Sequence, residues 1–371
     1  MKGLSVLPIV TMVVVILGAN YYVFHRLWQM MPPVVVGRVL LVGFAVVVVA
    51  APFLGLLGGD VLPVSFTAAM SKVGTSWLIV FLYLLLFFLV ADVVRVTRIF
   101  PVAKYMYANW AGLGVLFAGV LVLMLSGYFR YAHKDRVELS LSVHKELAGE
   151  VPLKIVAVSD LHLGYTIGRE ELDGWVKLIN DEQPDIVLIA GDITDNNVRP
   201  LNEQAMADAF RQIRTKYGIY TVFGNHEYIA GTAKAAAFFR SAGITLLRDS
   251  VALIDNRFYV IGRDDRSNSN RQSVAQLTAS LDHTKPLILL DHQPYHLEEA
   301  AENRIDFQFS GHTHNGQVWP LSLITKALFE QPHGYLQKGN THIYVSSGLG
   351  IWGGKFRIGT RSEYAVILIP R

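Results

Sequence analysis

Residues that bind metal ions follow several short apolar stretches in the second half of this sequence. Ile186 to Ala190 form one such run, and Gly191 and Asp192 come directly after it. A run of this kind predicts a buried parallel strand, and open α/β sheets place their chemistry at the carboxyl ends of such strands. Four further runs end in the same way, at Asp160-Leu-His162, Asn225-His226-Glu227, Asp291-His292 and Gly311-His312-Thr-His314. Asp, Asn and His are metal-ligand types, so the repeated pattern predicts a metal site at the strand ends.

The absence of cysteine restricts how such a site can be built. The chain has 371 residues and no cysteine, which excludes disulfides and thiolate ligands. Any metal must be held by His, Asp, Asn or Glu, a set that favours Mn, Fe or Zn over a closed structural zinc site. The formal net charge is only +3 and there is no block of Lys or Arg, so nucleic acid is not an expected partner.

Together, the motifs resemble those of the calcineurin-like metallophosphoesterase superfamily, and the HTHNGQ and SSGLG segments are similar to its bacterial membrane-anchored branch. The matching set is Asp160-x-His162, Gly191-Asp192-x-x-Asp195, Gly224-Asn225-His226-Glu227, His292 and Gly311-His312-x-His314. Each motif alone is weak evidence, but five motifs in the family order are specific. The resemblance implies an α/β domain of two central sheets flanked by helices, a four-layer αββα sandwich.

The resemblance also implies two divalent metal ions, with manganese favoured and iron or zinc as alternatives. The first metal would take Asp160, His162, Asp192 and His314. The second metal would take Asp192, Asn225, His292 and His312. Asp192 is the expected bridge, because a carboxylate has two oxygens that can reach two metals and an imidazole cannot bridge.

The implied reaction is hydrolysis of a phosphoester by attack of a metal-bridging hydroxide, with no covalent intermediate. His226 is not a metal ligand in this family, and the expectation is that it stabilises the phosphoryl charge or protonates the leaving oxygen. Asp195 is expected to fix the ring of His226 in one tautomer. His226 and Asp195 are therefore the predicted catalytic residues.

Three other segments are candidates for contact with substrate. Asn315 and Gln317 follow the last predicted ligand and could face the phosphate. Residues 263–266, Arg-Asp-Asp-Arg, form a charged loop for which we favour a solvated turn. The glycine-rich segment 348–354 is either an apolar lip that faces a membrane or a tight turn before the last strand.

Residues 1–130 are predicted to form a membrane domain with about four transmembrane helices. Apolar residues make up 52% of the chain and charged residues 17%, and the apolar excess lies before residue 130. A helix needs about 20 apolar residues to cross a bilayer. Suitable runs cover residues 4–23, 34–57, 77–94 and 110–128. A cleaved signal peptide ending at Ala19 is the rival interpretation of the first run and would leave three spans.

Basic residues suggest an orientation in the cell (inner) membrane. The loops after the first and third runs carry most of the positive charge of this region, at Arg26, Arg38, Arg95, Arg98 and Lys104. The positive-inside rule then places these loops in the cytoplasm and the catalytic domain outside it. Arg130, Lys134 and Arg136 favour the opposite orientation, but long domains translocate with little regard to charge.

Residues 131–371 are predicted to form the metallophosphoesterase domain, in which strands and helices alternate. Apart from the strands that carry the motifs, strands are expected at 137–143, 244–247, 258–261, 342–346 and 364–369. Helices are expected at 170–183, 202–217, 232–241, 272–281 and 295–301, from their periodic apolar residues.

The sequence thus predicts a membrane-anchored, metal-dependent phosphoric ester hydrolase acting on a lipid or cell-envelope phosphate. One alternative is a pyrophosphohydrolase like the UDP-diacylglucosamine hydrolases of lipid A synthesis, which requires a cytoplasmic catalytic domain. A second is a non-catalytic membrane sensor or scaffold, against which the intact ligands, His226 and Asp195 argue. A third is a transporter with a regulatory domain, although the spans lack the paired charges or interrupted helices that would support it.

Overall fold

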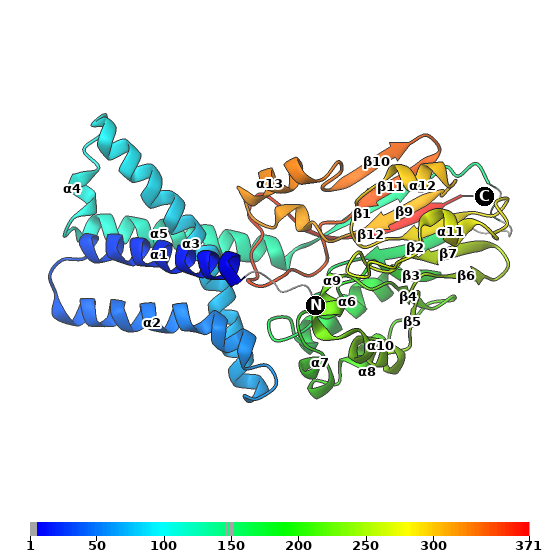
Figure 1. Cartoon of the computed structure of the whole chain (residues 1–371), viewed down its shortest axis with the longest axis horizontal. Coiled ribbons are helices and arrows are strands. Elements are labelled where there is room, and N and C mark those ends of the chain that lie inside the picture. Colours follow the sequence, from blue (N-terminus) through cyan, green and yellow to red (C-terminus); the bar gives the residue numbers. More distant parts are fainter. Residues whose placement is uncertain (1–5, 146, 148–151, 371) are drawn as a thin grey trace. The chain divides into compact units, whose positions relative to one another are not determined.

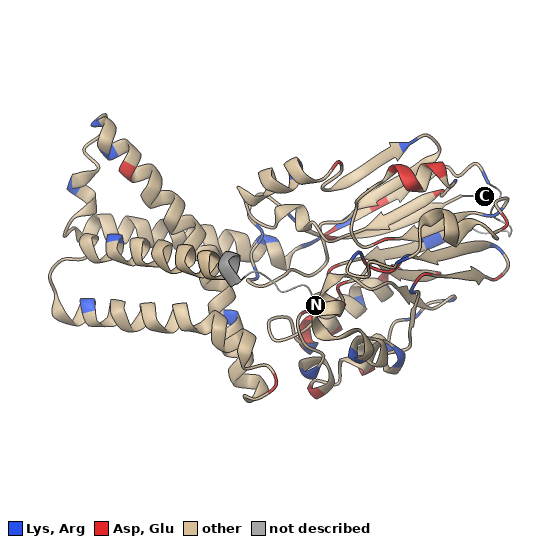
Figure 2. Cartoon of the chain, in the orientation of Figure 1, with Lys and Arg blue, Asp and Glu red and all other residues tan. Residues whose placement is uncertain are grey.

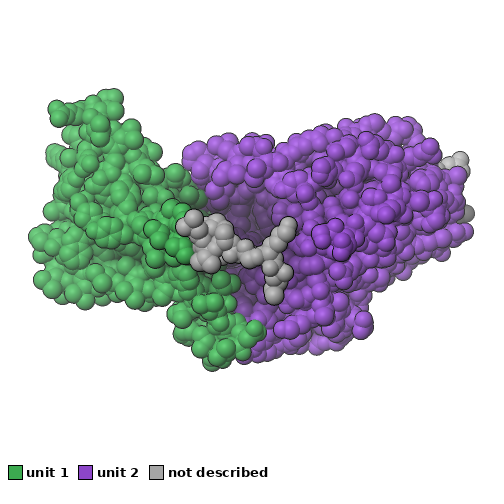
Figure 3. Space-filling model, in the orientation of Figure 1, with its two compact units in different colours: residues 1–127 green, residues 128–371 purple. Residues whose placement is uncertain are grey.

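Long helices form the first part of the chain in the computed structural model (Figure 1). They are α1 (Val6–Met30), α2 (Val35–Leu57), α3 (Val64–Thr97) and α5 (Trp110–Ala132), with the short α4 (Ala103–Met106) before α5. The structure describes residues 6–145, 147 and 152–370. The chain divides into two compact units, residues 1–127 and 128–371 (Figure 3).

All four long helices are apolar enough and long enough to cross a membrane, and they carry few charged residues (Figure 2). The four predicted apolar runs are confirmed as long helices, and this is a membrane protein. The third helix begins at Val64, well before the predicted start near residue 77. Polar residues such as Thr67 interrupt the apolar run without interrupting the helix, because the Thr67 hydroxyl donates to the Pro63 carbonyl at 3.2 Å within the same helical turn.

The second unit contains two six-stranded mixed sheets. The first has the order β1 (Lys134–Ser140), β12 (Ser362–Ile369), β2 (Leu153–Val158), β3 (Ile186–Ile189), β4 (Ile219–Thr221) and β5 (Ile244–Leu246). The second has the order β10 (Gly334–Lys338), β11 (Thr341–Val345), β9 (Phe307–Ser310), β8 (Leu287–Leu290), β7 (Phe258–Gly262) and β6 (Ser250–Ile254).

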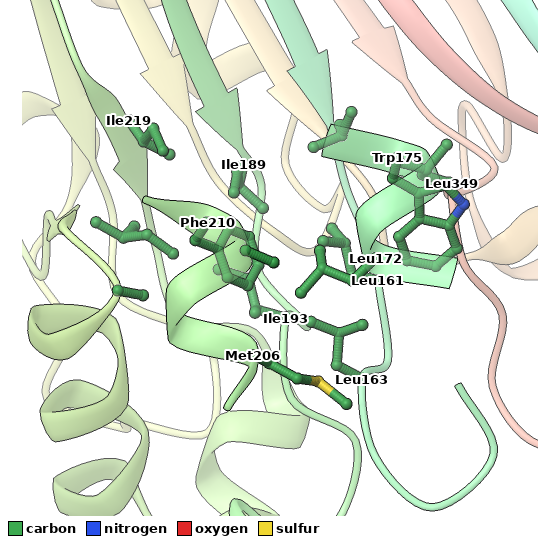
Figure 4. Close-up of a cluster of buried hydrophobic side chains, with 14 of the residues drawn as sticks. Leu161, Leu163, Leu172, Trp175, Ile189, Ile193, Met206, Phe210, Ile219 and Leu349 are labelled. Atoms are coloured by element: carbon green, nitrogen blue, oxygen red, sulfur yellow. The ribbon is translucent and has the colours of Figure 1, made fainter. Parts of the chain in front are cut away.

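Alternation along the strands builds two cores, one on each face of the first sheet. Ile189 packs with Trp175 of α6 (Arg169–Asp181) in a core between sheet and helices (Figure 4). Its neighbour Leu188 points to the other face and packs with Phe258 and Phe307 of the second sheet. Both faces of the central strands are thus buried, which explains why their sequences are continuous apolar runs.

Helices complete the layers. The helices that follow the first-sheet strands are α7 (Arg199–Glu203), α8 (Met206–Phe210), α9 (Asn225–Ala230) and α10 (Thr232–Ser241). Those of the second half are α11 (Val274–Thr278), α12 (Glu298–Glu302), the 3₁₀ turn η1 (His314–Gly316) and α13 (Leu321–Leu328). The predicted fold class, an apolar helical region followed by an α/β domain of two sheets with helices, is confirmed.

The strand directions bring the predicted ligand loops to common edges. Strands β2, β3 and β4 are parallel neighbours, as are β7, β8 and β9. The carboxyl ends of parallel strands lie at the same edge of a sheet. The loops after β2, β3, β4, β8 and β9 therefore converge.

Some expected elements differ. The single helix expected at 202–217 is wrong, because the structure has α7 and α8 with Ala205 between them in a left-handed conformation at φ 49°. A left-handed residue cannot continue a right-handed helix. Strands β6 and β10 and helix α13 were not predicted, although Leu321, Ile324 and Leu328 of α13 recur at helical spacing.

Glu363 of β12 is a fully buried carboxylate that ties the end of the second sheet to the first. It accepts hydrogen bonds from His333 Nε2 at 3.0 Å, Tyr344 at 3.0 Å and the Ser347 N–H at 3.0 Å, and it pairs with Arg361 at 2.7 Å. Burial alone would raise the pKa of Glu363, but the hydrogen bond and charge of His333, with Ser347 and Arg361, lower it to about 2.

This shift predicts acid sensitivity. A carboxylate whose pKa is lower in the folded than in the unfolded state stabilises the fold above its unfolded pKa, near 4.5, and loses that stabilisation as the pH falls towards 2. The full contribution is about 3 kcal/mol. We expect Glu363→Gln to flatten the fall in urea-denaturation midpoint between these pH values, measured on the detergent-solubilised chain. Glu203→Gln, at an exposed position, should keep the wild-type slope, and equal slopes for all three proteins would contradict the assignment.

Candidate metal centre

The ligand loops turn sharply where each predicted ligand stands. Asp160, His162, Asp192, His312 and His314 all have left-handed backbones, with φ of 54°, 47°, 52°, 72° and 49°. Non-glycine residues pay about 1–3 kcal/mol for such conformations and keep them where the surrounding structure imposes them. Strained backbone conformations cluster at functional sites, so five of them among the predicted ligands indicate a functional site here.

One group of side chains joins the loops after β2 and β9. Asp160, His162 and His314 offer ligand atoms that lie within 4.8 Å of one another. His314 Nε2 lies 3.5 Å from Asp160 Oδ1 and 3.0 Å from His162 Nε2. Both nitrogens and the carboxylate point into the same small space.

A second group joins the loops after β3, β4, β8 and β9. His292 Nε2 lies 3.2 Å from Asp192 Oδ2 and 3.3 Å from Asn225 Oδ1, and His312 Nδ1 lies 2.9 Å from the same Asn225 oxygen. His292 Nδ1 is 2.7 Å from the Ala190 carbonyl and must donate to it. That bond fixes the orientation of the ring and directs Nε2 into the site.

Asp192 lies between the two groups. Its Oδ2 atom is 3.7 Å from His162 Nε2 of the first group and 3.2 Å from His292 Nε2 of the second. Burial alone would raise the pKa of Asp192, but the charge and hydrogen bond of His292 lower it, so the group is an anion at neutral pH. The structure therefore brings all seven predicted ligands together, with Asp192 in the shared position.

The electrostatics fit bound cations. Burial and the charge of His292 lower the pKa of His312 to about 4, and burial and His162 lower that of His314. Both rings are neutral at pH 7 and offer lone pairs. Neutral His312 and His314 beside the ionised Asp192 in one buried space are suited to divalent metals.

Two glycines allow the loops to approach the carboxylates. A Cβ at Gly224 would lie 2.1 Å from Asp192 Oδ1, and a Cβ at Gly311 would lie 2.3 Å from Asp160 Oδ2. Any larger residue would displace a predicted ligand. In their place the backbone approaches closely, and the N–H of His226 donates to Asp192 Oδ1 at 2.9 Å.

The predicted catalytic pair is also in contact. His226 Nδ1 lies 3.2 Å from the backbone carbonyl of Asp195 and 3.3 Å from its Oδ1, and the ring of His226 packs edge-on to that of His162, with centroids 4.5 Å apart. Asp195 Oδ1 is also 3.5 Å from His162 Nδ1, so this carboxylate orients two rings where one was expected. Burial alone would lower the pKa of His226, but the Asp195 hydrogen bond and the Asp192 charge raise it to about 9.

The remaining predicted contacts lie differently. Gln317 is buried and its side-chain amide donates to the Gly354 carbonyl at 3.3 Å, whereas Asn315 is partly exposed in η1. The solvated turn expected at 263–266 is wrong for most of its residues. Arg263, Asp264 and Asp265 are buried, and Asp265 accepts from Gln293, next to His292, at 2.8 Å. Only Arg266 of this segment is exposed.

Two supporting residues carry no sequence signal of their role. Glu227 is fully buried and accepts from the N–H groups of Asp192 at 3.0 Å, Thr194 at 2.9 Å and Gly224 at 2.7 Å, which locks two ligand loops together. Glu227 directly follows Asn225-His226, but its partners Asp192 and Thr194 lie 35 and 33 residues away in the chain. Arg357, the second of these residues, belongs to none of the sequence motifs, so the sequence gives no sign of its role.

Arg357 is a buried cation that holds backbone rather than a carboxylate. Its guanidinium donates to the carbonyls of His314 at 2.8 Å, Gly350 at 3.0 Å and Ser347, and to Ser362 Oγ at 3.2 Å. The planar group with its fixed fork of donors thus fastens a ligand-bearing turn to the segment that carries Gly350.

Comparison with known proteins agrees with this geometry. Residues 153–316 match the family model of the calcineurin-like phosphoesterases. A protein described as an uncharacterized metallophosphoesterase from Helicobacter pylori J99 is 28% identical over 359 residues, 95% of each chain. A transmembrane protein with metallophosphoesterase domain from Danio rerio is 32% identical over 269 residues, 67% of this chain and 61% of that protein. The uncharacterized metallophosphoesterase YkuE of Bacillus subtilis is 29% identical over 271 residues, 69% of this chain and 94% of YkuE.

The site and these matches define a metal-dependent phosphoesterase domain. This membrane protein therefore carries a calcineurin-like metallophosphoesterase domain, matched over residues 153–316. The predicted enzyme class, a phosphoric ester hydrolase, is confirmed, and so is the presence of His and Asp groups able to bind metal.

We expect Arg357→Lys to weaken metal binding although the charge is kept. A lysine ammonium cannot reach carbonyls of both segments with parallel bonds, so the turn that carries His314 loosens. Changes to groups that orient ligands lower metal affinity by about 10- to 100-fold. Calorimetric titration with Mn²⁺ measures this, with the exposed Arg211→Lys as control. Wild-type affinity in Arg357→Lys would show that this arginine serves only packing.

Proposed function

We propose that this protein is a membrane-anchored dinuclear phosphoesterase whose substrate is a lipid or cell-envelope phosphate. The observation that carries the proposal is the pair of ligand groups that share Asp192, with Asp192 Oδ2 within 3.7 Å of one group's histidine and 3.2 Å of the other's. In this proposal Asp160, His162, Asp192 and His314 hold one metal, and Asp192, Asn225, His292 and His312 hold the other. Mn²⁺ is the favoured ion, with Fe or Zn as alternatives.

Two divalent cations bound there would supply hydroxide at neutral pH and neutralise the phosphoryl oxygens. The rest of the chemistry belongs to the side chains. Asp195 holds His226 through Nδ1, which leaves Nε2 for a substrate oxygen. With a pKa of about 9, the His226 ring carries a proton at pH 7 and can give it to the leaving oxygen.

His226 and Asp195 favour an enzyme over a sensor. A protein that only bound phosphate or metal would have no use for a protonated imidazole held by a buried carboxylate beside the ligands. The choice between phosphoester hydrolysis and pyrophosphate cleavage on the cytoplasmic face depends on the side of the membrane on which the second unit lies.

Substitution of the shared ligand and of the acid tests this function. Asp192→Asn and His226→Ala should each lower metal-dependent hydrolysis of 4-nitrophenyl phosphate or its diester by about 10²-fold or more, because the first weakens the shared metal ligand and the second removes the proton donor. Turnover of the full chain in detergent, stripped and reloaded with Mn²⁺, is the measurement. Exposed positions provide the controls Asp173→Asn and His296→Ala. Metal-replete, folded wild-type protein without turnover on either ester would favour the sensor.

We further propose that the second unit lies on the outer side of the inner membrane, away from the cytoplasm. The sequence contains no cysteine, so single cysteines at exposed Lys177 and Arg98 can be labelled without background. In spheroplasts, a membrane-impermeant maleimide should label Lys177→Cys and leave Arg98→Cys unlabelled until lysis. The reverse pattern would place the catalytic unit in the cytoplasm and favour the pyrophosphohydrolase.

A further inference from the structure

Helix α13 exposes its large apolar side chains and buries a small polar one, which is the reverse of a usual surface helix. The large aliphatic side chains Leu323, Ile324 and Leu328 are 54%, 55% and 65% exposed, whereas the small polar Ser322 is only 8% exposed. A surface helix normally buries its apolar face. Lys326 is the one charged residue of the helix. The outward face of α13 is therefore built for an apolar environment.

Two tryptophans extend this surface. Trp319 and Trp352 are 52% and 47% exposed. The segments that carry them are paired, because the Trp319 N–H donates to the Ile358 carbonyl at 2.7 Å and Val318 forms a bridge with Ile358. Nine large apolar side chains are exposed among the described residues from 133 onward, and six of them belong to this surface: Trp319, Leu321, Leu323, Ile324, Leu328 and Trp352. We call these six residues the apolar face.

The apolar face adjoins the ligand loops. Helix α13 packs on η1, which contains His314, so closely that a Cβ at Gly316 would lie 2.4 Å from the Ser322 nitrogen. On the side of Trp352, the Gly350 N–H donates to the Asp160 carbonyl at 3.1 Å. The two segments that carry the face are therefore the segments that hold two predicted ligands in place.

The same segments are fastened to the end of a membrane span. Tyr131, in the last turn of α5, is 2% exposed and belongs to the core cluster that contains Trp175, Leu349 and Ile351. Figure 4 shows Leu349 beside Trp175. The Tyr131 hydroxyl donates to Glu171 at 2.6 Å, and Glu171 also pairs with Lys355. The loop that carries Trp352 is thus tied on both sides to the point where the chain leaves α5.

We propose that the apolar face seats on the lipid bilayer, so that the metal centre acts on phosphoesters presented at the membrane surface. This inference rests on the proposed phosphoesterase function and narrows its substrate to the membrane-borne class. Aliphatic side chains with tryptophans at the edge and little charge match the boundary between headgroups and acyl chains. Because β1 begins two residues after α5 ends, the unit remains within reach of the bilayer, and the binding is intramolecular.

The position of the face can be measured without any turnover. The cysteine-free chain accepts Leu323→Cys carrying an environment-sensitive fluorophore, reconstituted in vesicles of phosphatidylethanolamine and phosphatidylglycerol. The label should emit as in an apolar medium and be quenched by brominated lipids. Leu253→Cys on β6, 45% exposed and outside the apolar face, provides the matched control and should emit as in water.

Two outcomes of this measurement overturn the proposal. One is an aqueous emission at position 323 equal to that at 253. The other is shielding of position 323 that persists in detergent and disappears on dilution of the protein, which would assign the face to a second copy of the chain. Because neither outcome involves catalysis, both are distinguishable from failure of the phosphoesterase proposal.

A kinetic comparison tests the substrate class. Leu323→Glu combined with Ile324→Glu should lower turnover of an aryl phosphate that carries a long alkyl chain in vesicles by about tenfold or more, and change turnover of the same soluble aryl phosphate by less than about twofold. Leu253→Glu should change neither. Equal loss on both esters, or no loss on either, contradicts the proposal. Absence of wild-type turnover on the soluble ester would instead count against the phosphoesterase, while the fluorescence result would still stand.

Discussion

The convergence of metal-binding side chains in a dry space is the constraint on which the rest of the second unit depends. Histidines and carboxylates from five loops point their lone pairs and charges at one another, with His162 Nε2 and His314 Nε2 only 3.0 Å apart. Polar groups in such a setting are costly unless something satisfies them. Divalent cations would do so, and a site of this kind therefore couples metal binding to folding.

The fold meets this constraint by fixing backbones first. Parallel strands in two sheets direct the loops to common edges, and five ligand residues accept left-handed conformations that the surrounding structure imposes. Buried Glu227 then holds the loops after β3 and β4, and buried Arg357 holds the turn with His314. Each of these two side chains bonds to backbone groups, so the loss of either would leave buried donors or acceptors unpaired, which costs about 1–3 kcal/mol per group.

Much of the fold and the ligand set could be predicted from the sequence because the signals are local. Asp192 follows its strand by three residues, and His312 and His314 follow theirs within four, so strand and ligand are read in one window. Long apolar runs marked the spans for the same reason. Arg357, the pairing of Asp195 with two histidines and the burial of residues 263–265 depend on contacts between distant segments, which spacing does not encode. The apolar residues of α13 recur at helical spacing, but their outward direction is a tertiary feature that the spacing does not encode.

Membrane anchoring and catalysis meet in the segment from Gly348 to Arg357. Its glycines approach the loop of Asp160, its Leu349 and Ile351 share a core with the last turn of α5, and its Trp352 is exposed. A stretch that a sequence analysis could assign either to a lip or to a turn therefore combines both features, a tight backbone and an outward tryptophan. This combination supports the proposal that the substrate is presented at the membrane surface.

The measurement that tests the central claim most directly is electron paramagnetic resonance of the full chain during titration with Mn²⁺. Two manganese ions that share a carboxylate lie about 3.5–4 Å apart and couple magnetically. We predict that the spectrum of isolated Mn²⁺ gives way to that of a coupled pair as the second equivalent binds. Retention of an uncoupled spectrum at two bound equivalents, or saturation at one ion per chain, would contradict a dinuclear centre bridged by Asp192.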